Sequence, residues 1–165
     1  LEEVAREAGV SKGGLLYHFP SKEVLTVAMV ERFTERFDRA VLDLAAQDPE
    51  PVGRITRAYV RATLGEAPAT GAAFDLACGS LTAMLANFPE KLGVVRAQSE
   101  RWQAAIERDG LDPLLATTVR LAIDGLWLGE NFNLSRMAPE RRDALARFLV
   151  ALTYPAASAE RRAAS

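Results

Sequence analysis

The residues with the most distinctive chemistry lie close together near the start of the chain, between positions 11 and 22. They supply a capping hydroxyl, two lysines, two adjacent glycines, a phenol and an imidazole: Ser11, Lys12, Gly13, Gly14, Tyr17, His18 and Lys22. Lysine neutralises phosphate, polar aromatic side chains can reach base edges, and glycine lets a backbone approach closely. The group therefore predicts contact with double-stranded DNA.

The elements that would position these residues are short helices. Residues 1–8 carry an apolar face, and Gly9 can end that helix in the left-handed conformation. Ser11 is a good N-cap for a second helix, which we expect to reach about Tyr17, and Ser21 caps a third. Two short helices around a glycine turn are typical of a helix-turn-helix, whose second helix enters the major groove.

Each of the DNA-contact predictions has a structural alternative. Gly13 and Gly14 cost helix stability, roughly 1 kcal/mol each relative to alanine, which close contact with DNA would offset. They would otherwise mark a weak helix start. Lys12 can reach a phosphate or a guanine edge, or it is simply a solvated lysine. Lys22 begins the third helix, where backbone N–H groups favour a phosphate.

Tyr17 and His18 are the sharper predictions, because both offer a donor and an apolar edge for a thymine methyl group. His18 could instead be an aromatic spacer that packs against the head. It is the single histidine of the chain, which excludes a multi-histidine metal site. We expect no cofactor and no metal. Val10, Leu15 and Phe19 are assigned to the core.

Composition limits the remaining possibilities. The 165 residues carry a net charge of −2, so any DNA binding must be local. The single cysteine excludes a disulfide within the chain and fits a reducing compartment. The sequence contains no run of 18 apolar residues, so no membrane span is predicted, and its first residues as given do not have the pattern of a signal peptide. No metalloprotease, nucleophile-elbow or phosphate-loop motif indicates an enzyme.

Helical patterns fill the rest of the chain, and no segment shows the alternation of a strand. We predict an all-α fold, with a helix-turn-helix head and connector helix at residues 1–45 and a ligand-binding and dimerisation body at residues 46–165. The expected helices after the head cover residues 21–46, 51–64, 72–88, 89–110, 113–132 and 139–152, followed by a frayed tail from Pro155.

The pattern A-G-V-S-K-G followed by L-L-Y-H-F-P-S-K-E, within residues 1–25, resembles the tetracycline-repressor (TetR) family of bacterial transcription regulators. The resemblance implies a dimer that binds a palindromic operator, probing two major-groove turns about 34–36 Å apart. It also implies a small-molecule effector. The simplest form is a repressor that leaves its operator when the effector binds. The resemblance further implies that the protein works in the bacterial cytoplasm, at the nucleoid. Beyond residue 25 the resemblance is one of architecture.

Two features depart from the family pattern. Family members begin with a helix ahead of the first one here, so we expect roughly 20 to 30 further residues upstream, because a head must cover its apolar face. Leu16 stands where many members have a phosphate-binding tyrosine. Tyr17 lies about 100° further round the helix, which leaves a phosphate role at this position open.

The last two helices suggest how two chains could pair. Residues 113–132 are apolar on several sides, and Gly125 and Gly129 would let another helix approach. With residues 139–152 they would form a four-helix interface across a two-fold axis. The alternative is a central helix in a monomeric bundle.

Between the connector and the middle helices we expect a pocket for a largely apolar effector. Aromatic, methionine and hydroxyl side chains are the candidates, although plain core is an alternative for all of them: Phe37, Tyr59, Thr63, Phe74, Leu81, Met84, Leu85, Phe88, Trp102, Ile106 and Trp127. Asp124 lies four residues after Arg120, which predicts a local ion pair. An effector in the pocket would tilt the connector helix and change the spacing of the two heads.

Two other function classes remain open at this point. One is a dimerisation or small-molecule-binding module without DNA function. The other is a helical enzyme that uses carboxylates alone. Salt-dependent binding to duplex DNA would separate the regulator from both.

Overall fold

The computed structural model describes residues 1–67, 70, 79–80, 92–134 and 137–155, and every regular element in this part of the chain is an α-helix. This confirms the all-α prediction. The elements are α1 (Glu2–Glu7), α2 (Lys12–His18), α3 (Lys22–Ala46), α4 (Arg54–Thr63), α6 (Gly93–Glu107), α7 (Pro113–Asn131) and α8 (Pro139–Leu152).

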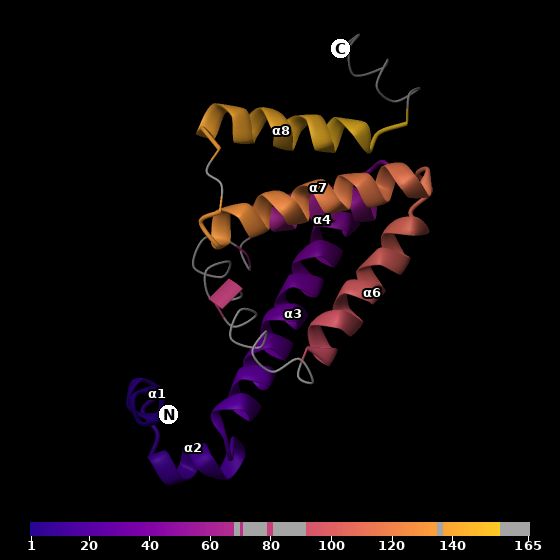
Figure 1. Ribbon diagram of the computed structural model, residues 1–165. Coiled ribbons are helices and arrows are strands. Elements are labelled where there is room, and N and C mark those ends of the chain that lie inside the picture. Colours follow the sequence, from indigo (N-terminus) through magenta and orange to yellow (C-terminus); the bar gives the residue numbers. More distant parts are fainter. Residues whose placement is uncertain (68–69, 71–78, 81–91, 135–136, 156–165) are drawn as a thin grey trace.

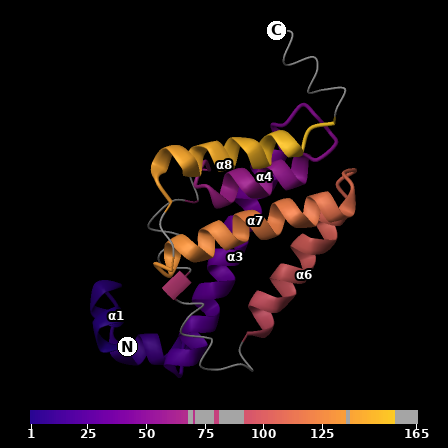
Figure 2. The ribbon, with the colours of Figure 1, turned by 45° about the horizontal axis from the view of Figure 1, so that its top comes forward.

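The helices divide the molecule into a small head and a larger body. Helices α1 and α2 lie at one end and α8 at the other, and the long α3 runs from the head into the body (Figure 1). The same separation is visible after rotation (Figure 2). Among the described helices, none is both long and apolar enough to cross a bilayer.

Local capping forms the head as the sequence predicts. Gly9 has a φ of 68°, the left-handed conformation that turns the chain after α1. The Ser11 Oγ accepts a hydrogen bond from the Gly14 N–H at 3.0 Å, and the Ser21 Oγ accepts one from the Val24 N–H at 3.2 Å. Each serine satisfies a backbone donor that its helix leaves unpaired.

The start of α4 differs from the prediction that placed Pro51 at its first position. The helix begins at Arg54, after Gly53 with a φ of 77°. Its first-turn N–H groups, from Ile55 and Thr56, donate to the carboxylate of Asp109 at 3.1 and 2.7 Å. A partner more than fifty residues away therefore fixes where this helix begins.

The later boundaries agree in part. Asp112 caps α7, its Oδ1 accepting from the Leu115 N–H at 3.0 Å, as the Asp-Pro pair predicts. Helix α8 begins at Pro139, also as predicted. Helix α6 starts at Gly93. Of the helix expected over residues 72–88 only residues 79–80 are described, and they are helical; Pro89 and the tail from residue 156 lie outside the described residues.

One large hydrophobic core fills the body, and a much smaller cluster surrounds Val30 on α3. The body core joins α3, α4, α6, α7 and α8, with Val41, Val60, Ile106 and Val119 fully buried. In the head Leu15 is buried and Phe19 is half-buried. The core assignment of Val10 is wrong for this structure, because 49% of its surface is exposed.

A buried arginine connects the α3–α4 loop to the end of α8. The Arg57 side chain is 1% exposed, and its Nε donates to Asp48 Oδ2 at 2.6 Å. Its terminal nitrogens donate to the backbone carbonyls of Glu50, Val52 and Thr153 at 2.6, 2.9 and 2.7 Å. All three guanidinium nitrogens are therefore satisfied.

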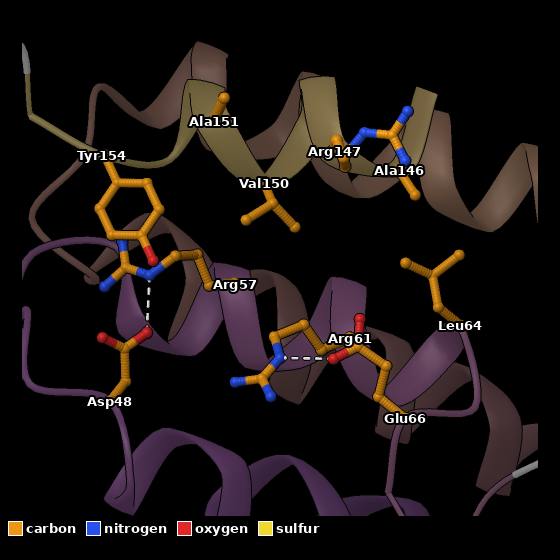
Figure 3. A pocket seen from close by; sticks show the side chains of 10 residues that line it. All are labelled: Asp48, Arg57, Arg61, Leu64, Glu66, Ala146, Arg147, Val150, Ala151 and Tyr154. Carbon is orange, nitrogen blue, oxygen red and sulfur yellow. Dashed lines mark hydrogen bonds and ion pairs between the residues drawn. The ribbon is translucent and has the colours of Figure 1, made fainter. Parts of the chain in front are cut away.

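Arg57 also forms part of a cavity of about 520 Å³ between α4 and α8, where its guanidinium lies 4.2 Å from the centre of the Tyr154 ring (Figure 3). Burial alone would raise the pKa of Asp48, but the bond to Arg57 and a further backbone hydrogen bond hold that pKa below its ordinary value. The carboxylate therefore stays charged opposite the guanidinium.

Replacing Arg57 with methionine should lower the free energy of unfolding by about 3–5 kcal/mol, because it leaves the Asp48 charge buried without its partner. Urea denaturation followed by circular dichroism measures the change. Arg61→Ala is the matched control, since Arg61 pairs with Glu66 at the surface, and it should cost less than about 1 kcal/mol. Equal losses in the two variants would contradict the role given to Arg57.

Candidate functional site

The residues predicted to contact DNA all lie on the exposed surface of α2 and the start of α3. All seven are classed as exposed: Ser11, Lys12, Gly13, Gly14, Tyr17, His18 and Lys22. Tyr17 is 83% exposed, and its ring meets that of His18 edge to face at 5.1 Å between centroids. The tip of α2 therefore presents a polar aromatic pair to the surroundings.

The glycines of α2 differ in the space around them. A Cβ at Gly13 would meet nothing within 4 Å, so this side of the helix is open to a close partner. A Cβ at Gly14 would lie 3.1 Å from Ser11 Oγ, the atom that caps the helix. Glycine at position 14 thus avoids a close contact with the capping serine, while glycine at position 13 leaves the backbone of the helix accessible.

The two lysines are placed differently. Lys12 Nζ lies 3.0 Å from Glu2 Oε2, so its charge already has a partner on α1. Both side chains are well exposed, and such surface pairs contribute little to stability. A phosphate could therefore replace Glu2 at small cost. Lys22 is exposed at the first position of α3.

A second candidate site is a cavity of about 430 Å³ in the body, between α3, α4, α6 and α7. Five of the predicted effector residues line it: Phe37, Tyr59, Thr63, Trp102 and Trp127. Ile106 instead lies in the body core with no exposed surface. The other five predicted residues lie outside the described part of the chain: Phe74, Leu81, Met84, Leu85 and Phe88.

Three aromatic rings form one apolar wall of this cavity. Phe37, Tyr59 and Trp102 contact one another edge to face, with centroids 5.2 to 6.1 Å apart. Such geometry places the positive edge of one ring against the negative face of another. The wall is thus preformed by residues from α3, α4 and α6.

A polar network forms another wall. The Tyr59 hydroxyl donates to Asp124 Oδ1 at 2.8 Å, and Arg120 Nε lies 3.4 Å from Asp124 Oδ2. Burial raises the pKa of Asp124 despite these partners, and burial next to Asp124 raises the pKa of Tyr59. The predicted Arg120–Asp124 ion pair is therefore confirmed, but it belongs to a larger network on the cavity.

Sequence reasoning did not predict ten further residues of the lining: Phe33, Thr34, Val95, Gln98, Ser99, Arg120, Leu121, Asp124, Gly125 and Leu128. Asp124 carried a readable signal, a carboxylate within an apolar helix. The bond to Tyr59 gave none, because the two residues are 65 positions apart.

Two side chains that line the cavity also pack against Val30 in the first half of α3. Phe33 and Val95 line the cavity. The same two side chains pack against Val30, which is 1% exposed, together with Leu92 and Val94. Phe33 and Val95 therefore belong both to the cavity lining and to the small cluster around Val30 on α3.

Exposed apolar side chains recur along α7, and one more lies on α8. On α7 the exposed side chains recur at alternating spacings of three and four residues: Leu114, Thr118, Leu121, Gly125, Leu128 and Phe132. Phe148 on α8 is 59% exposed. We call this set the α7–α8 face. A heptad-like stripe of this kind is typical of a helix that packs on another helix.

Comparison with known proteins adds two matches to family models. A model described as bacterial regulatory proteins, tetR family, matches residues 1–29. A model described as the tetracyclin repressor-like C-terminal domain matches residues 53–154. Together they cover the head and most of the body.

Individual relatives match over a shorter region. The HTH-type transcriptional regulator RutR of Escherichia coli (strain K12) is 41% identical over 64 residues, which are 39% of this chain and 29% of that protein. RutR of Shigella flexneri gives the same figures. The matched part thus spans less than a third of these relatives. No solved structure matched the chain.

The family models describe regulators, which agrees with the prediction of a regulator and not an enzyme. On the strength of the body model, the head model and the exposed helix-turn-helix, this chain belongs to the TetR family of bacterial DNA-binding transcriptional regulators.

Proposed function

We propose that this protein is a ligand-responsive repressor that binds a palindromic operator as a homodimer and leaves it when a small, largely apolar effector enters the body cavity. In this proposal residues 1–45 form the DNA-binding head and connector, and residues 46–165 form the ligand-binding and dimerisation body. The observation that carries it is the joint exposure of all seven DNA-contact candidates on α2 and the start of α3.

The head would read DNA through α2 in the major groove. Tyr17 and His18 face base edges or the backbone, Gly13 permits close approach, and Lys22 holds a phosphate at the start of α3. With a net charge of −2 for the whole chain, a single head has few cations and would bind weakly. Two heads on one duplex face are therefore required.

The double variant Tyr17→Ala, Lys22→Ala should lose at least about tenfold in affinity for a duplex selected from a random pool by the wild-type protein. Lys22→Ala alone should reduce the slope of log affinity against log salt by about 1 per head. Fluorescence anisotropy at several salt concentrations measures both quantities.

Arg147→Ala is the control for lost positive charge, because Arg147 is exposed on α8, and α8 lies at the end of the molecule opposite α1 and α2 (Figure 1). It should leave DNA affinity unchanged. Duplex binding that is equally strong in the double variant would favour a ligand-binding or dimerisation module whose head does not contact DNA.

The α7–α8 face supports the dimer. Leu114 is 79% exposed and is followed along the stripe by Leu121, Leu128 and Phe132, all exposed. Burying apolar surface contributes about 25 cal/mol per Å², so two such faces gain by pairing. A Cβ at Gly125 would meet nothing within 4 Å, which leaves room for a second helix to approach.

Phe148→Glu should convert the dimer to a monomer without unfolding the chain, because it puts a charge into the proposed contact surface and not into the monomer core. Leu42→Glu is the matched control: Leu42 is 57% exposed on α3, outside the α7–α8 face. Sedimentation velocity should show half the mass for the first variant and the wild-type mass for the second. A dimer that survives Phe148→Glu would place the interface elsewhere.

The effector would act by changing the balance between two head spacings. It can do so only through a different affinity for the two states. The contact of Phe33 and Val95 with Val30 supplies the route, since these residues join the cavity wall to α3. Effector binding would then tilt α3 and separate the heads from two successive major-groove positions.

A further inference from the structure

Most hydrogen-bond donors around the body cavity already have acceptors within the protein. The hydroxyls of Thr34 and Thr63 each donate to a backbone carbonyl of their own helix, at 2.8 and 2.9 Å. Trp102 Nε1 donates to Asp38 Oδ1 at 2.8 Å, and Gln98 Nε2 donates to the same oxygen. An anionic ligand would therefore find few free donors on these walls.

Arg120 is occupied in the same way. Its Nη1 donates to Ser99 O at 3.0 Å and to Gln103 Oε1 at 2.8 Å, and its Nη2 donates to Ser99 Oγ at 2.8 Å. Its remaining nitrogen, Nε, faces Asp124 in the ion pair. The charges of the pair cancel, so a charged ligand would bring an uncompensated charge into a largely apolar site.

Among the described residues that line the cavity, Asp124 keeps capacity to accept a hydrogen bond. An ionised carboxylate offers about four lone-pair positions. Tyr59 donates to Oδ1, and Arg120 approaches Oδ2 at 3.4 Å without meeting hydrogen-bond geometry. The side chain is 36% exposed on the cavity. Asp124 Oδ2 therefore remains available to a ligand as an acceptor, while Arg120 Nε, which lies against it, is buried and donates no hydrogen bond.

We propose that the effector is an uncharged molecule with a flat apolar body and one N–H or O–H group, which donates a hydrogen bond to the carboxylate of Asp124. This assignment rests on the proposed function, in which the cavity is the effector site. The edge-to-face wall of Phe37, Tyr59 and Trp102 contacts the flat body. Asp124 then selects for the donor, because a ligand without one covers Asp124 Oδ2 and offers that oxygen no hydrogen bond.

Four naphthalenes with different groups at the same carbon test this assignment: 2-naphthol, its methyl ether, 2-naphthoate and 2-(aminomethyl)naphthalene. They share one apolar body and present a neutral donor, no donor, an anion and a cation. Isothermal titration calorimetry with the full chain should give an affinity for 2-naphthol that is at least about tenfold higher than for each of the others.

Asp124→Asn keeps the size of the side chain and an acceptor for Tyr59 but removes the charge. It should reduce the preference for 2-naphthol over its methyl ether to less than about threefold. Asp143→Asn is the matched control, because it removes the same charge from an exposed position on α8 that is not part of the cavity lining, and it should keep the wild-type preference. Thermal melts confirm that both variants are folded.

The outcomes test separately the preference for a hydrogen-bond donor and the assignment of the cavity as the effector site. If the methyl ether, the anion or the cation binds as tightly as 2-naphthol, the proposed selection of a neutral donor by Asp124 (the donor rule) is wrong, while the cavity remains a binding site. If the preference persists in Asp124→Asn, the selecting group is another residue. If none of the four compounds binds, both the donor rule and the proposed effector cavity are overturned, whereas DNA binding by the head is tested separately.

Discussion

The arrangement of the body depends on one buried guanidinium. Arg57 holds the loop after α3, the first turn of α4 and the last residues of α8 through one carboxylate and three backbone carbonyls. Tyr59 and Thr63, which line the cavity, follow on the same helix. A planar donor with fixed geometry therefore sets the position of the helix that carries one wall of the site. Lysine could not make these contacts in the same plane.

The head and the body use polar groups in opposite ways. In the head the polar side chains are exposed, and the pair of Lys12 with Glu2 is a surface contact that an anion can replace. In the body they are buried and paired: Asp109 receives the N-terminus of α4, and Asp48 receives Arg57. Exposed, weakly paired charge suits reversible contact with DNA, and buried, satisfied charge suits a scaffold with one shape.

Sequence reasoning succeeded wherever the deciding interaction is local. Ser11, Ser21 and Asp112 each bond to an N–H three residues ahead, and such caps are legible in the sequence. It failed at the start of α4, because the capping carboxylate of Asp109 comes from the turn after α6, far away in the sequence. The lining of the cavity was predicted only in part for the same reason. The spacing of the aromatic residues is visible in the sequence, but the Tyr59–Asp124 hydrogen bond depends on the tertiary packing.

Both tryptophans of the chain, Trp102 and Trp127, lie on the wall of the same cavity, and the head has none. Indole emission responds to the polarity and the quenching groups in its immediate surroundings. The tryptophan fluorescence of the unlabelled protein therefore reports whether the cavity contains water or a bound ligand. Binding of the distant helix-turn-helix to a duplex would change this fluorescence only if the body moved.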